Sequence, residues 1–187
     1  MHRTILTPPA IAAPALAELK QWLGISTAHD DAALTALLRA SLDICEAFTG
    51  IMPLVAECEE TAPPARCWQG LATRPVQAIT GVEAIAPDGQ RFALASGDYE
   101  IDLDADGGGR VRFPAPSGRE LSGRERVAVR FTAGLVAEWE DLPAALRHGI
   151  ARLAAHQHRE RETGGASPLP PASVAALWRP WRRLRVA

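Results

Sequence analysis

The chain has 187 residues, of which 47% are hydrophobic, and a formal net charge of −2. This size and composition are typical of one globular domain with a substantial core, or of a small domain that carries an insertion. No window approaches the roughly 20 apolar residues that a transmembrane helix needs. The N-terminus also lacks a signal-peptide pattern, so we expect no membrane partner and assembly in the cytoplasm.

Charge is distributed unevenly along the chain. Residues 1–106 hold 6 Lys and Arg against 15 Asp and Glu, whereas residues 107–187 hold 14 against 7, so the balances are −9 and +7. Such a split suits a chain that stacks on copies of itself or on oppositely charged neighbours. It equally suits two halves that neutralise each other within one fold, and the sequence leaves both interpretations open.

The N-terminal part predicts an arm followed by two helices. Residues 1–13 are rich in Pro and Ala and show no periodicity, which indicates an extended N-terminal arm. Residues 14–53 carry apolar side chains at helical spacing in two successive segments. Gly24 and Gly50 follow these segments at the positions of helix C-caps, so residues 14–53 predict the N-terminal helical part of the body.

The middle of the chain changes to the pattern of β-strands. Residues 54–134 contain short runs in which apolar and charged residues alternate, as around Ile101, Val111 and Val129. Gly81 marks a possible bulge in a strand over Val76–Ala86. The alternation predicts a small antiparallel sheet with one charged, solvated face. Because helical patterns flank it, we interpret this region as a β insertion in a helical protein.

The helical period returns over residues 135–163, which predict a long C-terminal helix of the body. Residues 164–187 then predict a Gly- and Pro-rich linker, a short helical turn at Ser173–Leu177 and a tail. The predicted fold class is therefore α+β. Its body is mainly α-helical, with two N-terminal helices and a long C-terminal helix, an inserted small antiparallel β region and an extended C-terminal tail.

The residue types that usually carry chemistry form no convincing constellation. Asp102-x-Asp104-x-Asp106-Gly107 matches half of an EF-hand loop, but the twelfth position is Phe113 instead of Glu, which favours a polar hairpin turn. The three cysteines have no CxxC spacing and predict buried free thiols, and His148, His156 and His158 lack the spacing of a helical zinc pair. Without a nucleophile elbow or phosphate loop, we expect no enzyme, catalytic residue, metal or cofactor.

The tail has the most distinctive composition, because its last ten positions hold two tryptophans and four arginines. Trp and Arg are enriched at protein interface hot spots, which favours docking on another protein. Contact with nucleic acid is the second interpretation, although a pI near 6.2 disfavours it, and a strand on the chain's own surface is the third. The predicted docking residues are Leu177, Trp178, Arg179, Pro180, Trp181, Arg182, Arg183, Leu184 and Arg185.

We further expect this segment to be unfolded until it meets its partner. The linker that begins at Gly164 separates it from the last predicted helix, and Pro180 prevents a continuous helix. In this interpretation Leu177, Trp178 and Trp181 are apolar anchors and the arginines fix the register.

The order of these signals resembles the head–tail connector proteins, also called adaptor or head-completion proteins, of long-tailed bacteriophages and phage-derived gene transfer agents. The resemblance covers nearly the whole chain and rests on the order and spacing of several stretches. They are Leu16-Ala-Glu-Leu-Lys-Gln-Trp-Leu-Gly24, Asp30-Asp31-Ala-Ala-Leu-Thr-Ala-Leu-Leu38, Glu46-Ala-Phe-Thr-Gly50, Thr73-Arg-Pro-Val-Gln77, Asp98-Tyr-Glu-Ile-Asp102, Val127-Ala-Val-Arg-Phe-Thr-Ala-Gly134, Leu142-Pro-Ala-Ala-Leu-Arg-His-Gly-Ile150, Arg159-Glu-Arg-Glu162 and Leu177-Trp-Arg-Pro-Trp-Arg-Arg-Leu-Arg185.

The resemblance implies a structural protein of the neck of a phage-like particle, assembled in the bacterial cytoplasm. Such proteins form a ring, typically of twelve copies, beneath the portal protein and present a platform to a stopper or tail-completion protein. DNA passes through the lumen without sequence-specific binding. The tail would dock on the portal. The alternative from a different class is a monomeric nucleic-acid-binding accessory protein that uses the Arg/Trp tail.

Overall fold

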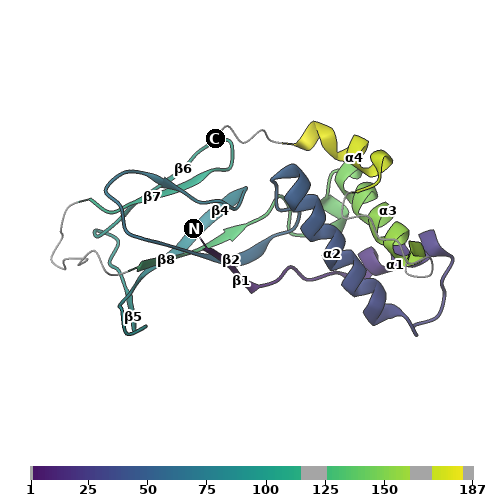
Figure 1. Cartoon of the computed structure of the whole chain (residues 1–187), viewed down its shortest axis with the longest axis horizontal. Helices are drawn as coiled ribbons and strands as arrows, with labels where there is room; N and C mark the ends of the chain where they lie inside the picture. The colour runs from purple at the N-terminus through teal and green to yellow at the C-terminus, as the bar shows by residue number, and fades with distance from the viewer. Residues whose placement is uncertain (1, 115–125, 161–169, 183–187) are drawn as a thin grey trace. The chain divides into compact units, whose positions relative to one another are not determined.

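The computed structural model describes residues 2–114, 126–160 and 170–182. The chain folds into two compact units. The β unit contains Met1–Pro8 and Val55–Gly134, and the helical unit contains Pro9–Leu54 and Leu135–Ala187. Each unit is therefore built from two separate stretches of chain, which bring distant parts of the sequence together (Figure 1).

The described part of the β unit forms two antiparallel sheets. One has five strands in the order β1-β2-β8-β4-β5, and the other has three in the order β3-β7-β6. Alternation along β8 places Val127, Val129 and Phe131 in the interior at 0–1% exposure. Glycines allow close packing between the sheets, since a Cβ at Gly109 would lie 3.0 Å from both Leu71 and Val76. The strands are β1 His2–Thr7, β2 Ala56–Ala62, β3 Gln69–Gly70, β4 Val76–Ile85, β5 Arg91–Ala93, β6 Glu100–Leu103, β7 Gly109–Arg112 and β8 Arg126–Ala133.

Part of the predicted arm is an edge strand. We expected residues 1–13 to form an extended arm, and within it His2–Thr7 is extended as β1 and pairs antiparallel with β2, with Arg3 opposite Glu60 and Ile5 opposite Cys58. No local pattern predicts this pairing, because the partner strand lies more than fifty residues away. The predicted bulge near Gly81 is confirmed by a register shift between Ile79 and Gly81.

In its described residues, the helical unit packs four α-helices around one apolar core. They are α1 Ala13–Leu23, α2 Asp31–Thr49, α3 Ala144–Glu160 and α4 Ala172–Trp178, with 3₁₀ turns η1 at Trp139–Asp141 and η2 at Arg179–Trp181. Gly24 and Gly50 adopt φ values of 72° and 75° and end the first two helices, as their positions in the sequence predict. The core includes Leu19, Leu38, Leu146, Ile150 and Trp178.

The structure corrects the predicted fold class in two respects. The expected mixture of helices and antiparallel strands is present, but the β part contains eight named strands in two sheets, more than the small sheet that we expected. The C-terminal tail adds a fourth helix that packs on α3 (Figure 1). In the described part of the chain, no helix combines the length and apolarity needed to cross a membrane.

Candidate docking site

The described part of the predicted docking segment is folded. Residues 172–178 form α4, which begins after Pro171, and residues 179–181 continue as the 3₁₀ turn η2. Val174 and Trp178, four residues apart on one face of α4, are 1% and 0% exposed. The helix is thus fixed to the helical unit by its own apolar face.

Trp178 is held by a specific fit against α3. A Cβ on Gly149 would lie 2.8 Å from Cε2 of Trp178, so the indole occupies space that only glycine leaves open. The indole Nε1 donates to the carbonyl oxygen of Leu146 at 3.5 Å, and the ring centroid lies 6.0 Å from that of Phe48 on α2. The most buried aromatic side chain of the tail is therefore part of the core.

The expectation of an unfolded docking segment is wrong for residues 172–182, whereas the short helical turn predicted at Ser173–Leu177 is confirmed by α4. The composition identified an amphipathic aromatic segment, but it could not show that Gly149 provides a complementary surface within the same chain. The end of the predicted C-terminal helix after Glu160 lies outside the described residues, and of the predicted linker from Gly164 only Pro170 and Pro171 are described. Arg183, Leu184 and Arg185 also lie outside them.

The other docking residues that the structure describes lie wholly or partly at the surface. Arg179, Pro180 and Arg182 are exposed, and Leu177 and Trp181 are half-buried. The guanidinium carbon of Arg182 lies 5.5 Å from the centre of the Phe48 ring, a distance at which a cation–π attraction operates. The structure thus separates an internal anchor, Trp178, from an exposed cationic group that follows it directly.

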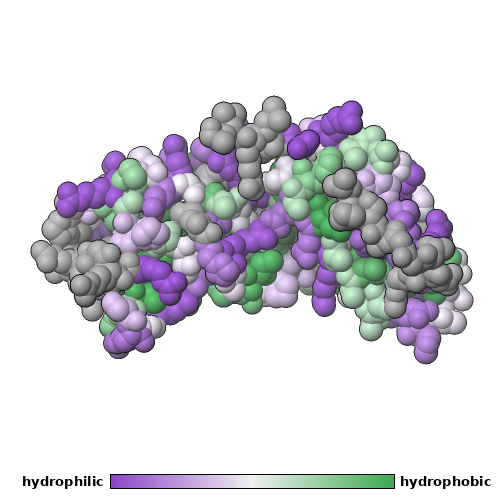
Figure 2. All heavy atoms as spheres, in the orientation of Figure 1, coloured by the Kyte–Doolittle hydropathy of each residue, from purple (hydrophilic) through white to green (hydrophobic). Residues whose placement is uncertain are grey.

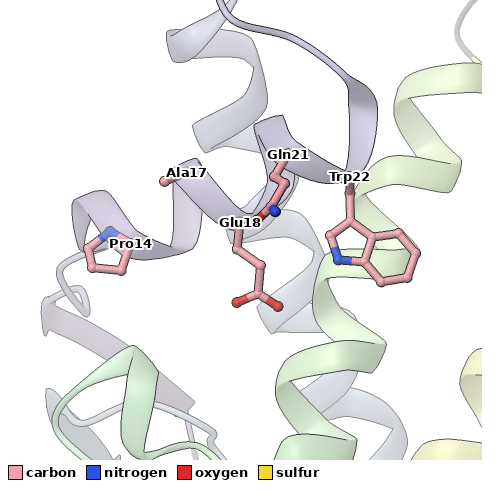
Figure 3. Close-up of a pocket in the computed structure, with 5 residues that line it drawn as sticks. All are labelled: Pro14, Ala17, Glu18, Gln21 and Trp22. Carbon is pink, nitrogen blue, oxygen red and sulfur yellow. The ribbon is translucent and has the colours of Figure 1, made fainter.

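The surface of both units is mixed in character. The visible face carries hydrophilic residues and separate hydrophobic patches on each unit (Figure 2). On the helical unit, α1 borders an open depression lined by Pro14, Ala17, Glu18, Gln21 and Trp22 (Figure 3). Glu18 accepts a hydrogen bond of 2.9 Å from the indole nitrogen of Trp139, so its carboxylate already serves the core.

Trp22 lies at the surface, although its helical spacing predicts a buried side chain. It follows the helical spacing of the apolar residues around it, yet it is 41% exposed. Its ring meets that of His148 on α3 edge to face, with centroids 4.9 Å apart, and Figure 3 shows the indole lying beside that helix. No contact of this depression indicates a particular ligand.

The acidic motif of the sequence forms a hairpin. Asp102 pairs with Arg110 across β6 and β7, and Asp104 Oδ1 accepts a hydrogen bond of 2.6 Å from the backbone nitrogen of Gly108. That backbone hydrogen bond lowers the pKa of Asp104. The motif is thus used for a turn, and within the described ranges no three His, Cys, Asp or Glu residues are grouped so that they could hold a metal ion.

The thiols differ from the expectation at one position. All three cysteines are free, and Cys45 and Cys58 are buried as predicted, but Cys67 is exposed. Burial raises the pKa of Cys45 to about 12, so this thiol is inert at neutral pH. Cys67 lies in a short irregular segment before β3, where the sequence offers no periodicity to locate it.

The sequence did not predict an ion-pair network on the five-stranded sheet. Glu59 on β2 is bound by both terminal nitrogens of Arg91, at 2.7 and 2.9 Å, and by Arg130 at 3.3 Å. Glu83 accepts from the same two arginines. The hydrogen bonds from Arg91, followed by those from Arg130, lower the pKa of Glu59. Alternating charges indicated a charged face, but not which strands are adjacent.

Comparison with solved structures places this geometry among known proteins. The chain is similar over its full length to neck chains of gene transfer agent particles. It covers 100% of its own length and 98% of a chain from the neck of an empty particle computed with C6 symmetry, with a TM-score of 0.78 and 26% identity. A chain from the virion of a native particle gives a TM-score of 0.77 at 26% identity. A chain from a native neck computed with C12 symmetry gives 0.74 at 28%.

No family model matches the chain, and no curated protein matches it. The similarity to the neck chains includes both units, because it extends over the whole chain. Gene transfer agents are among the phage-like particles whose connector proteins the order of motifs in the sequence resembles.

Proposed function

We propose that this protein is a head–tail adaptor in the neck of a phage-like particle, with a structural and not an enzymatic role. The observation that carries the proposal is the full-length similarity to chains of gene transfer agent necks, at a TM-score of up to 0.78. It favours a gene transfer agent over an infectious phage. The similarity includes the β unit, so the proposal gives that unit a place in the neck as well.

The proposed assembly is a ring of twelve copies beneath the portal protein. The C12 and C6 symmetries of the similar necks support it, because a closed ring with rotational symmetry repeats one heterologous contact between neighbours. The opposite side of the ring would receive the stopper or tail-completion protein. DNA would pass through the lumen without sequence-specific contacts.

We propose that the C-terminal segment docks on the portal through the residues that follow Trp178. Trp178 fixes the base of the segment on α3, so the exposed Arg179 and Arg182 and the half-buried Trp181 start from a defined position. Such preorganisation reduces the entropy lost on binding. Arginine suits this role because its planar guanidinium forms paired hydrogen bonds with carboxylates and stacks on aromatic rings.

The test uses full-length variants and portal-bearing capsids that lack the neck. Replacing Arg179, Trp181 and Arg182 by Glu, Ala and Glu should abolish co-sedimentation with the capsids while circular dichroism remains that of the wild type. Arg39→Glu, which reverses an exposed charge on α2, serves as the control and should bind normally. Deletion of residues 173–187 is a poorer test, because it also removes Trp178 from the core.

Normal capsid binding by the triple variant would overturn the docking role of the tail. The alternative, a monomeric nucleic-acid-binding protein, makes a different prediction. It requires binding to DNA that weakens steeply as salt rises, and the triple variant should then lose affinity for DNA in the absence of any capsid.

A further inference from the structure

Strand β6 exposes apolar side chains that belong to the interior face of its sheet. Ile101 and Leu103 are 45% and 42% exposed. Yet Ile101 lies directly opposite Val111 on β7, which is 0% exposed, and Leu103 lies opposite the buried Gly109. Opposite residues of an antiparallel pair point to the same face, so the apolar interior of the β unit continues to the surface at β6.

This apolar face is buried at β7 and exposed at β6. Leu71 and Val76 pack closely over Gly109, whereas β6 is the outer strand in the order β3-β7-β6. In the part of the chain that the structure describes, no strand pairs with the second edge of β6. An open edge next to exposed apolar side chains is a surface on which another strand can pair.

A second open edge lies elsewhere on the β unit. Strand β1 is the first in the order β1-β2-β8-β4-β5, and its Leu6 is 42% exposed. Strand β6 packs near β4, which β2 and β8 separate from β1, so the two edges belong to different sides of the unit. A chain with two such edges can contact one neighbour with each.

Charge disfavours the pairing of two β6 edges. Residues 98–106, which contain β6, hold five Asp and Glu and no Lys or Arg, and two of these carboxylates are paired by Arg110 and Arg112. Residues 1–17, which contain β1, hold no Asp or Glu, and the guanidinium of Arg3 donates to the Thr73 hydroxyl of the same chain. A β1 edge therefore brings no like charge to β6, whereas a second β6 edge would place carboxylates together.

We propose that the β6 edge of one copy binds the β1 edge of a second copy of this chain. The contact joins different surfaces, so it is heterologous and can repeat around a ring. This inference rests on the proposed ring-forming function and assigns the contact between neighbours to the β unit. The exposed halves of Ile101, Leu103 and Leu6 would become buried in it.

A cross-linking experiment tests the contact directly. A full-length chain with Leu6→Cys and Leu103→Cys, in a Cys67→Ser background that removes the exposed native thiol, is treated with a short bismaleimide. The double variant should give a ladder of covalent oligomers larger than dimers. Each single variant should give no such ladder, because a head-to-tail chain of links needs both thiols.

A second measurement uses Leu103→Lys with Trp22→Lys as the matched control, since both residues are exposed apolar side chains and Trp22 lies on α1 of the helical unit. Loss of the partial burial of one leucine corresponds to about 1.4 kcal/mol, or a tenfold weaker self-association in sedimentation velocity. The control should self-associate like the wild type.

The outcomes separate this inference from the proposed function. Wild-type self-association without the ladder, or a wild type that stays monomeric at every concentration, would overturn the edge contact. Reduced capsid binding but normal self-association of Leu103→Lys would also overturn it and would assign β6 to another neck protein. If instead the ladder forms but no variant or wild type binds portal-bearing capsids, the edge contact stands and the adaptor function fails.

Discussion

The two units bury different kinds of polar group. In the helical unit the buried polar residues are the hydroxyl-bearing Ser41 and Thr49, and in the β unit they are Glu59, Glu60 and Thr73. Thr49 satisfies its hydroxyl locally, by donating to the carbonyl oxygen of Cys45 at 2.7 Å. The β unit instead holds carboxylates that bind groups from other segments. The helical unit is thus stabilised mainly by apolar packing, and the β unit depends in addition on ionic and polar anchors.

Glu60 illustrates the second strategy. It is 1% exposed, and its carboxylate accepts hydrogen bonds from the backbone nitrogens of Ala72 and Thr73, both at 2.9 Å, and from the Thr73 hydroxyl at 2.8 Å. A buried carboxylate requires such partners, because an unpaired charge in the interior is costly. Glu60 thereby fixes the segment between β3 and β4 on β2.

The largest effect is expected from removing the anchor of the tail. Trp178→Ala should lower the free energy of unfolding by about 3–5 kcal/mol, because a large and fully buried side chain is lost from the apolar core. Denaturant titration followed by circular dichroism measures the change. Trp22→Ala is the control, since Trp22 is 41% exposed, and it should cost much less. Equal effects of the two variants would contradict the packing described for Trp178.

The next effect concerns Glu60 and shows whether the β unit depends on its polar anchors. Glu60→Gln should destabilise the chain by about 2 kcal/mol, since the amide NH₂ would face the N–H of Ala72 and leave this partly buried donor without an acceptor. Hydrogen exchange should show the loss of protection in residues 72 and 73 first. Glu57→Gln on the same strand, which is only half-buried, should leave that protection unchanged.

A smaller effect is expected from filling the space above Gly149. Gly149→Ala should destabilise the chain by about 1–2 kcal/mol, because the new Cβ overlaps the indole of Trp178, although alanine favours a helix by about 1 kcal/mol. In the Trp178→Ala background the same substitution should become stabilising. A double-mutant cycle without this reversal would show that the two residues do not interact.

The smallest effect concerns Glu59 and depends on pH. Its folded-state pKa lies below the ordinary value of 4.5, so the unfolded chain binds the proton more readily as the medium becomes acidic. The stability from this group is therefore present above about pH 4.5 and is lost as pH falls through the lower folded pKa.

Glu59→Gln should cost about 1 kcal/mol at neutral pH, a modest figure because Arg91 and Arg130 are about 40% exposed. The cost should shrink as pH falls below 4.5, which thermal unfolding at several pH values measures. A cost that stays constant over this range would assign the effect to packing instead of charge.

The sequence predicts the helical unit better than the β unit. The reason is the distance along the chain between the residues that contact each other. The period of the apolar residues and the caps Gly24 and Gly50 locate α1 and α2, because a helix is stabilised by contacts within a few residues of each other. The pairing of β1 with β2 depends on residues far apart, and buried Glu59 and Glu60 break the alternation that identifies a strand.

Composition predicted which segment forms the candidate docking site, but it did not predict which residues of that segment are buried. The density of Trp and Arg identified the C-terminal segment, but the burial of Trp178 depends on Gly149 in a different helix. A glycine within a helical pattern gives no signal of what packs on it. The exposed edge of β6 was also not predicted. Alternation predicts that Ile101 and Leu103 lie on the apolar face of the sheet, but it does not show whether other residues pack on that face at β6.

Imaging of the chain bound to portal-bearing capsids that lack the neck tests the adaptor function most directly. We expect a ring of added density beneath the portal, with twelve-fold rotational symmetry and room for both units of each copy. Capsids without added density, or protein bound along released DNA in place of the portal, would contradict it.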